Sequence, residues 1–302
     1  MTTTTLLQIF TSAGVELRRD SLRRARQRLR ALGFDAVLDP SVHARHQRFA
    51  GDEAARLATL YRVAEAAPSI AMACRGGYGM TRLLDTIDWK RIARSIDRGT
   101  RWVGYSDMTT LQLGLLAHTG SPTWAGPMAC DDFGRSDEEG GVDEVARDCF
   151  VEAMSGALHA VGFRTEAGFD GLHARGVLWG GNLTMICSML GTPHFPHVKG
   201  GILFVEDVNE HPYRVERCLL QLHQAGVLKQ QKAVLLGAIS GWRKSPLDRG
   251  YSLKSVVAHL RSTMRTPLLT GLPFGHVPLK VTLPLGVRVE LAVDRREAFV
   301  GW

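Results

Sequence analysis

The first half of the chain alternates short apolar segments with longer helix-like segments, and this alternation limits the fold more than any other feature. Strands are predicted at residues 6–10, 36–38, 70–74 and 102–105. Helices are predicted at residues 20–32, 51–66, 80–86 and 107–118. Strands and helices that alternate in this way form a parallel sheet with crossover helices. The sequence therefore predicts an α/β fold with an N-terminal parallel-sheet domain.

Glycines punctuate the chain around residues 156–175, and a mixed pattern follows them. Further strands are predicted at residues 177–179, 202–205, 234–239 and 287–293, with a helix at 212–225. A chain of 302 residues, of which 45% are hydrophobic, has the length of about two domains. We expect an N-terminal domain over residues 1–160, a linker over 161–175 and a C-terminal domain over 176–302.

The formal net charge of +7 raises the question of a nucleic-acid partner. Seven arginines concentrate in and just before one predicted helix, at Arg18, Arg19, Arg23, Arg24, Arg26, Arg28 and Arg30. Apolar residues repeat there at helical spacing, so the arginines are expected on a solvent-exposed face. No aromatic residues interleave with this basic stripe, as single-strand binding requires. We expect no nucleic-acid partner, and a basic surface that can attract acidic peptide substrates.

The sequence indicates neither a membrane segment nor a metal or disulfide framework. No apolar run reaches the roughly 18 residues of a membrane span, and the opening segment lacks the positive region of a secretory signal. The cysteines are Cys74, Cys130, Cys149, Cys187 and Cys218, and none forms a C-x-x-C pair. His194 and His197 lie close together without a third ligand, so a packing role is expected. We expect a cytoplasmic protein with no membrane partner, no metal and no other cofactor.

A serine stands at a predicted strand-to-helix turn in the segment Val103–Leu111. Ser106 lies between an apolar run that ends at Tyr105 and a helix predicted from Asp107. Such a turn exposes a hydroxyl and leaves backbone N–H groups free to stabilise an oxyanion. The second glycine of G-x-S-x-G is missing, since Met108 stands there, and Ser or Asp before a helix is commonly an N-cap. From this segment alone, a nucleophile and a helix cap are both open.

A glycine-rich run, Arg75-Gly76-Gly77-Tyr78-Gly79, follows another predicted strand. A strand-to-helix glycine turn brings backbone N–H groups close to an anion. The run lacks both the Lys-Ser/Thr of a P-loop and the spacing of G-x-G-x-x-G. Arg75 can hold a substrate carboxylate in bidentate fashion, or it can brace the loop through backbone carbonyl groups. The segment is thus a candidate anion-binding turn.

Two further residues are candidates because of where they stand. Glu206 follows the apolar run 202–205, at the end of a buried strand where α/β folds place functional groups, although a solvent-facing charge is the alternative. His276 stands in the segment Gly271–Pro278, whose glycines and prolines indicate a shaped loop.

Together with Trp179–Leu183 and Tyr213–Arg217, these segments resemble the LD-carboxypeptidase (muramoyltetrapeptide carboxypeptidase) family along nearly the whole chain. Members of that family are serine peptidases that trim D-alanine from peptidoglycan tetrapeptides during cell-wall recycling. The resemblance implies a catalytic triad of Ser106, Glu206 and His276. It implies an oxyanion hole formed by the N–H groups of Gly77 and Asp107. It also implies substrate binding by Arg75, Gly76 and Asn182.

The same resemblance carries expectations about architecture and partners. It implies an N-terminal domain similar to class I glutamine amidotransferase-like folds, a smaller β-rich C-terminal domain, a homodimer, and a small peptide or muropeptide as substrate. Because Ser106 stands in the first half and Glu206 and His276 in the second, we expect the active site at the domain interface. Two other functions stay open: a self-immunity peptidase that uses the same triad on peptide–nucleotide antibiotics, and a non-enzymatic protein that binds a small anion.

Overall fold

The computed structural model describes residues 5–302, which form two compact units. The first unit comprises the chain up to Leu158 together with Pro278–Pro284, and the second comprises His159–Val277 and Leu285–Trp302. Residues 1–4, on which part of the expectation about a secretory signal rests, lie outside the described residues. Among residues 5–302, no helix has both the length and the hydropathy needed to cross a membrane.

The first unit is built on a six-stranded sheet in the order β11-β5-β4-β3-β1-β2. Its strands are β1 (Thr5–Phe10), β2 (Phe34–Leu38), β3 (Ile70–Ala73), β4 (Arg101–Gly104), β5 (Thr123–Ala125) and β11 (Leu283–Leu285). The pairs that join β2, β1, β3, β4 and β5 are all parallel. The predicted parallel sheet of the N-terminal region is therefore confirmed.

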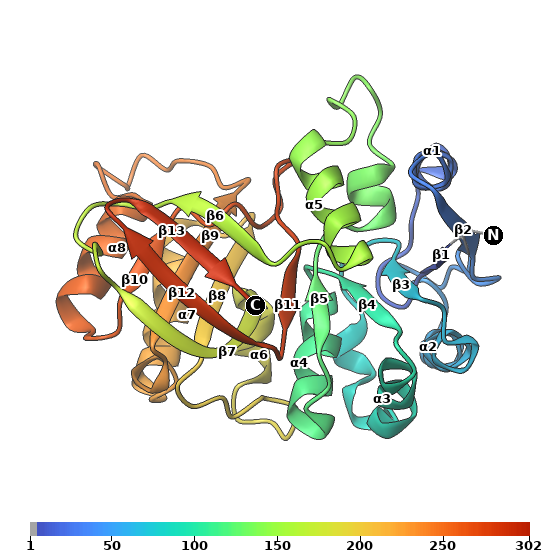
Figure 1. The fold of residues 1–302 in the computed structure, drawn as a ribbon, viewed down its shortest axis with the longest axis horizontal. Helices are drawn as coiled ribbons and strands as arrows, with labels where there is room; N and C mark the ends of the chain where they lie inside the picture. The colour runs from blue at the N-terminus through green and yellow to red at the C-terminus, as the bar shows by residue number, and fades with distance from the viewer. Residues whose placement is uncertain (1–4) are drawn as a thin grey trace. The chain divides into compact units, whose positions relative to one another are not determined.

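Helices cover both faces of this sheet. They are α1 (Arg19–Ala31), α2 (Glu53–Ala66), α3 (Trp89–Asp97), α4 (Met108–Thr119) and α5 (Glu144–Ser155). Figure 1 shows α1 and α5 on one side of the strands and α2 and α3 on the other. The apolar face predicted for the arginine-rich helix is buried in α1, where Leu22, Ala25 and Leu29 belong to the core.

The helix predicted at residues 80–86 is wrong. The segment instead forms two short 3-10 turns, η1 (Met80–Arg82) and η2 (Leu84–Thr86). A carboxylate from another segment binds the first backbone N–H of this stretch, since Met80 N donates to Asp107 Oδ2 at 2.8 Å. A regular helix begins only at α3, where the side chain of Asp88 caps the Arg91 N–H.

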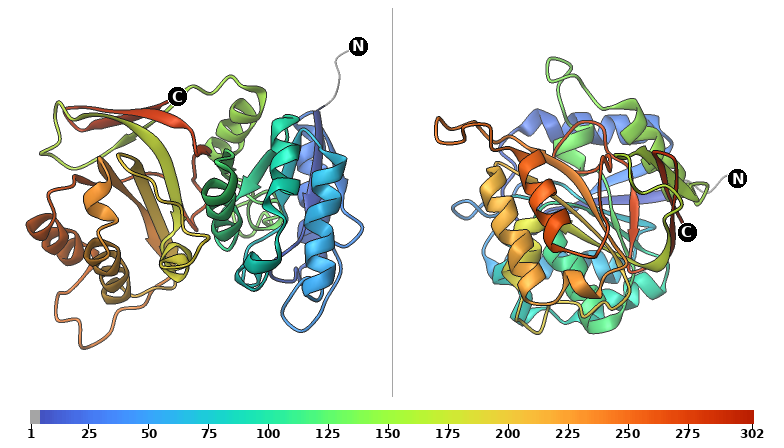
Figure 2. Two further views of the ribbon diagram at one scale, coloured as in Figure 1. Left: turned by 90° about the horizontal axis from the view of Figure 1, so that it is seen from below. Right: turned by 90° about the vertical axis from the view of Figure 1, so that its left-hand side faces the viewer.

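The second unit carries a seven-stranded sheet in the order β10-β9-β8-β7-β12-β13-β6. Its strands are β6 (Ala160–Arg164), β7 (His173–Asn182), β8 (Ile202–Val208), β9 (Ala233–Ser240), β10 (Leu268–Thr270), β12 (Arg288–Asp294) and β13 (Glu297–Gly301). The strands from β7 to β10 pair in parallel, whereas β12, β13 and β6 pair antiparallel. Figure 2 shows the antiparallel hairpin β12–β13 in red. The expected strand-rich C-terminal sheet is confirmed.

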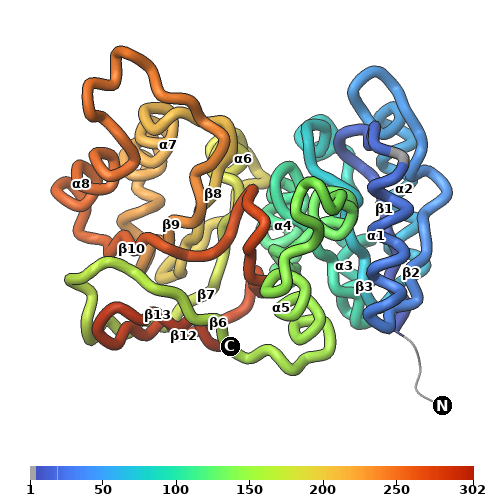
Figure 3. The backbone as a smooth tube through the Cα atoms, turned by 90° about the horizontal axis from the view of Figure 1, so that it is seen from above, coloured from blue at the N-terminus to red at the C-terminus, as the bar shows by residue number. Residues whose placement is uncertain are grey.

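The helices of the second unit accompany the parallel part of its sheet. They are α6 (Leu183–Met189), α7 (Pro212–Gln224) and α8 (Leu253–Thr263), with the short turn η4 (Leu228–Gln230). Figure 3 shows α6, α7 and α8 along the strands β7 to β10. The residues expected as a linker, 161–175, include most of β6, which pairs with β13. The glycines of that stretch mark the turn between β6 and β7, where Gly168 and Gly171 have φ of +102° and +77°.

Candidate active site

The serine at the predicted turn adopts a strained backbone conformation. Ser106 lies between β4 and α4 with φ of +62°, in the left-handed region that residues other than glycine rarely enter. Its side chain is half-buried, whereas the neighbouring Tyr105 and Asp107 are buried. Thr109 N donates to the carbonyl oxygen of Ser106 at 2.9 Å, which starts α4 directly after the turn. This is the geometry of a turn that exposes a nucleophile.

Gly76 lies directly against this serine. A Cβ atom at Gly76 would lie 2.7 Å from Ser106 Cβ, 2.8 Å from its Oγ and 3.2 Å from Asp107 N. Real Cβ atoms do not approach other atoms so closely, so this position requires glycine for close approach rather than for an unusual φ. The structure thus brings the glycine run predicted to hold an anion into contact with the candidate nucleophile.

The glycine run is held in place from two sides. Gly14 N donates to the carbonyl oxygen of Gly76 at 3.0 Å. On the other side Asp107 Oδ2 accepts the N–H of Met80, while Asp107 Oδ1 has no hydrogen-bond partner within residues 5–302. Burial raises the pKa of the Asp107 carboxyl to about 6. Gly77 has φ of +94°, a conformation that favours glycine. Its predicted role, and that of the Asp107 N–H, as oxyanion donors stays a prediction.

Arg75 makes a contact of the loop-bracing kind. Its Nη1 donates to the carbonyl oxygen of Val15 at 2.9 Å. This is the second of the two roles considered for this arginine from the sequence. This bond uses only one of the several N–H donors of the guanidinium. Binding of a substrate carboxylate by Arg75 therefore stays a prediction.

Glu206 and His276 form a hydrogen-bonded pair in the second unit. His276 Nδ1 lies 2.7 Å from Glu206 Oε2, with the imidazole 20% exposed and the carboxylate fully buried. Glu206 stands inside β8, where the register with β9 shifts between Val205 and Asp207. Such a bulge changes the direction in which a side chain points. The buried carboxylate excludes the solvent-facing alternative for Glu206, and its bond to Nδ1 fixes the orientation of the imidazole.

Asn182 binds the other oxygen of this carboxylate. Its Nδ2 lies 3.2 Å from Glu206 Oε1 and 3.0 Å from Asp207 Oδ1, and its Oδ1 accepts the N–H of Met185. The side chain is 5% exposed. These contacts hold the Glu206 carboxylate in orientation, and the substrate-binding role expected of Asn182 from the sequence stays a prediction. The register of β7 with β8 sets Asn182 directly opposite Glu206.

Asp207 is a buried acid that the sequence analysis did not single out. Its carboxylate accepts hydrogen bonds from the backbone and the hydroxyl of Thr184 at 2.9 and 2.8 Å. Burial raises its pKa above the ordinary value, although these donors and Asn182 act in the opposite direction. The signal that could have found it is its place beside Glu206, because two adjacent acids in an otherwise apolar strand need buried partners.

The loop that carries His276 is closely fitted to β8 and β9. A Cβ atom at Gly275, whose φ is +141°, would lie 3.1 Å from Glu206 Oε2. Ser240 Oγ donates to the carbonyl oxygen of His276 at 3.1 Å, and Ala238 N donates to Phe274 O at 2.8 Å. The loop predicted from its glycines and prolines is therefore present, and hydrogen bonds from β9 hold it in place.

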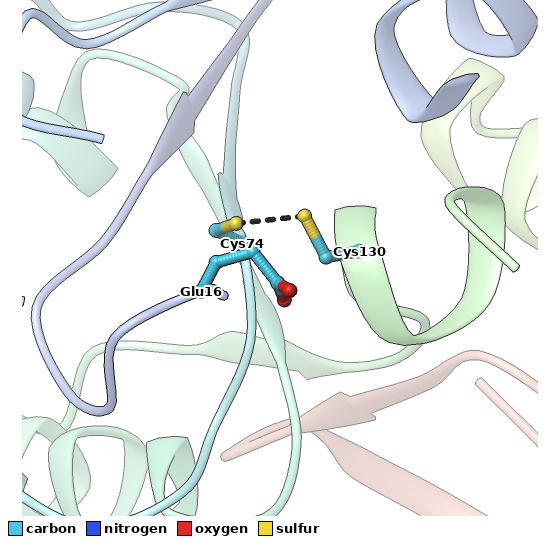
Figure 4. Close-up of side chains that lie close together, drawn as sticks. All are labelled: Glu16, Cys74 and Cys130. Carbon is cyan, nitrogen blue, oxygen red and sulfur yellow. Dashed lines mark hydrogen bonds between the residues drawn. The ribbon is translucent and has the colours of Figure 1, made fainter. Parts of the chain in front are cut away.

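Two cysteines and a glutamate form a separate cluster in the first unit (Figure 4). Cys74 Sγ lies 2.9 Å from Cys130 Sγ, and a carboxylate oxygen of Glu16 lies within 4.8 Å of both sulfur atoms. The hydrogen bond to Cys130, together with burial, raises the pKa of the Cys74 thiol. Glu16 already accepts hydrogen bonds from the backbone and guanidinium of Arg18. A protonated thiol and a carboxylate already paired with a cation are poor metal ligands.

Comparisons with known proteins find relatives over both units. Residues 8–126 match the LD-carboxypeptidase N-terminal domain and residues 175–291 match the LD-carboxypeptidase C-terminal domain. The murein tetrapeptide carboxypeptidase of Pseudomonas aeruginosa is 30% identical, over 91% of this chain and 90% of the relative. The crystal structure of a muramoyltetrapeptide carboxypeptidase from Oxalobacter formigenes has a TM-score of 0.89 and 38% identity, over 99% of each chain. A microcin self immunity protein, MccF, shares the fold with a TM-score of 0.86 at 21% identity, over 100% of this chain and 97% of its own.

Proposed function

The chain belongs to the LD-carboxypeptidase family of peptidases, and we propose that it is a serine LD-carboxypeptidase that removes the terminal D-alanine from peptidoglycan tetrapeptides. The observation that carries this proposal is the hydrogen bond between the buried Glu206 and His276 Nδ1. A carboxylate in this place holds one tautomer of the imidazole and stabilises the imidazolium when the ring takes a proton. This pairing supports an enzyme over a protein that only binds an anion.

In the proposed reaction, His276 takes the proton of Ser106 as the hydroxyl attacks the amide that links the diamino acid to D-alanine. The developing negative charge is stabilised by the N–H groups of Gly77 and Asp107. His276 then protonates the nitrogen of the departing D-alanine. Water, activated by the same imidazole, hydrolyses the acyl-enzyme and releases the tripeptide.

A second candidate function is hydrolysis of peptide–nucleotide amides. The fold shared with the self immunity protein MccF supports this alternative, although 21% identity indicates the fold alone. The same triad would act on a different acyl group. We favour the muropeptide reaction because the relatives with 30% and 38% identity carry murein tetrapeptide and muramoyltetrapeptide carboxypeptidase names. We also propose that the enzyme is cytoplasmic, as we expect from the sequence, and homodimeric, as the resemblance to the family implies.

The test is mass spectrometry of L-Ala-D-Glu-meso-diaminopimelate-D-Ala after incubation with the purified protein. We expect the loss of one D-alanine. The lysine-containing tetrapeptide and a peptide–nucleotide amide, assayed in parallel, identify the preferred acyl group. An untouched tetrapeptide together with a cleaved peptide–nucleotide amide would replace the first function with the second, and no cleavage of any substrate would contradict both.

A further inference from the structure

A lysine is buried in the first unit next to the serine turn. Lys280 has 1% of its side chain exposed and forms an ion pair with Asp132, which is 4% exposed. Burying two charges is costly, and a well-packed apolar pair of the same size is often at least as stable. A buried ion pair is therefore weak evidence for added stability, and its role has to be sought in the groups that it contacts.

The lysine also contacts Tyr105. Lys280 Nζ lies 3.4 Å from the Tyr105 hydroxyl and 4.5 Å from the centre of its ring. The cation is therefore in contact with both the polar tip and the π-face of one side chain. Asp132 is held in turn, since its Oδ2 accepts the N–H of Met128 at 2.7 Å. The contacts form one chain from Met128 through Asp132 and Lys280 to Tyr105.

Tyr105 directly precedes Ser106, whose left-handed backbone persists only where the surroundings hold it. On the far side of the serine, Asp107 is held by its bond to Met80 N. The carbonyl oxygen of Tyr105 accepts the N–H of Met108 at 3.2 Å, so a shift of Tyr105 would also move the first turn of α4. Ser106 is thus held by an anchored residue on each side.

We propose that Lys280 is a positioning residue that holds Ser106 in its reactive conformation through Tyr105. This inference rests on the proposed function, in which Ser106 is the nucleophile. Lys280 does not need to touch substrate in this role. A nucleophile displaced by about 1 Å can lose on the order of a hundredfold in rate, so a loosened Tyr105 is expected to reduce turnover without unfolding the protein.

The test variant is the double substitution Lys280→Met with Asp132→Asn. It removes both charges together, so no buried charge is left unpaired, and the asparagine oxygen can still accept the Met128 N–H. Lys232→Met is the matched control, because Lys232 donates one hydrogen bond at the surface, to Arg175 O at 2.7 Å. The measurements are kcat and KM for D-alanine release, the pH dependence of kcat/KM, and the thermal unfolding midpoint.

We expect the double variant to lose about 10- to 100-fold in kcat with little change in KM, while the pH midpoint of kcat/KM stays in place. An unchanged pH midpoint separates a displaced serine from a disturbed imidazole, since His276 stands only four residues before Lys280 in the chain. A kcat within twofold of the wild-type value would overturn the proposal. Lys232→Met is expected to leave all these values unchanged.

Two further measurements test the inference if the double variant does not fold or if the wild type releases no D-alanine. Tyr105→Leu removes the ring and hydroxyl but leaves the ion pair intact, so it should lower kcat in the same way even if the double variant does not fold. Amide hydrogen exchange of Met108 and Thr109, whose N–H groups bind Tyr105 O and Ser106 O, should accelerate in either variant. Unchanged exchange would overturn the inference. Because exchange needs no turnover, it decides the role of Lys280 even if the wild type releases no D-alanine.

Discussion

The serine turn and the glutamate–histidine pair are held in different ways, although we propose that they serve one reaction. The Ser106 turn depends on backbone shape. Its φ is +62°, and Gly76 packs so closely against it that a Cβ atom at Gly76 would lie 2.7 Å from Ser106 Cβ. The Glu206–His276 pair depends on polar atoms, since both carboxylate oxygens accept hydrogen bonds. The first region should therefore be sensitive to added volume, and the second to a lost charge or hydrogen bond.

The largest effect is expected from removing the hydroxyl itself. Ser106→Ala should fold normally and lose on the order of a thousandfold or more in kcat/KM, because the variant lacks the hydroxyl on which the proposed acyl-enzyme forms. D-alanine release measured beside circular dichroism checks both expectations. A wild-type rate in this variant would remove Ser106 from the proposed role.

The polar region is tested by changing charge without changing size. Glu206→Gln should reduce kcat by about a hundredfold to a thousandfold, because an amide no longer stabilises the imidazolium. Glu290→Gln is a matched control, since Glu290 also binds a histidine, His173, but at the surface of the second unit. If both variants keep full activity, the buried pair is structural and has no part in catalysis.

The packed region is tested by adding a single methyl group. Gly76→Ala would place that methyl within 2.8 Å of Ser106 Oγ, so we expect a loss of about tenfold to a hundredfold in kcat. At Gly301 a Cβ atom would have its nearest neighbour at 3.6 Å, which makes Gly301→Ala the control with ordinary contacts. Equal activity of the two alanine variants would show that close packing against the serine is unimportant.

The buried acid beside the serine provides a pH test of the same region. Burial raises the pKa of Asp107 to about 6, so the folded state holds its proton more tightly than the unfolded state, and the contribution of this group to stability falls as pH rises. Between pH 4.5 and 7 the loss amounts to about 2 kcal/mol. Asp107→Asn should remove this dependence. Urea unfolding of both proteins across this pH range measures the dependence. Free energies of unfolding that vary with pH in parallel in the two proteins would contradict the prediction.

The smallest expected effect is that of metal removal. EDTA or another zinc chelator should leave D-alanine release unchanged, because neither the serine turn nor the Glu206–His276 pair needs a metal ion in the proposed reaction. The cluster of Glu16, Cys74 and Cys130 is the site to examine if activity falls. Loss of activity with chelator, restored by added metal, would contradict the metal-free mechanism.

The sequence predicted the parts of the fold whose patterns are local. Residues 70–74 are a continuous apolar run and residues 6–10 are apolar apart from Gln8, and the structure forms β3 and β1 there. Strands such as β5 and β11 contain three residues each, too few to show a period, and β11 joins strands that lie far earlier in the chain. Such elements are stabilised by tertiary pairing, which local propensity does not contain.

The candidate site shows the same division. The serine turn could be predicted because its glycines and the strand-to-helix change are local features. The contact from Asn182 to Glu206 could not, since it depends on the register of β7 with β8 across 24 residues of sequence. The contact from Lys280 to Tyr105 joins residues 175 positions apart. Neither pairing leaves a local pattern in a single sequence.

The most direct test of the central claim, that Ser106 is activated by the Glu206–His276 pair, is peptide mapping by mass spectrometry after labelling with a fluorophosphonate. We predict a label on Ser106 in the wild-type protein, and a greatly slowed reaction in Glu206→Gln. A label on another residue, no label, or an equal labelling rate in the two proteins would contradict the claim.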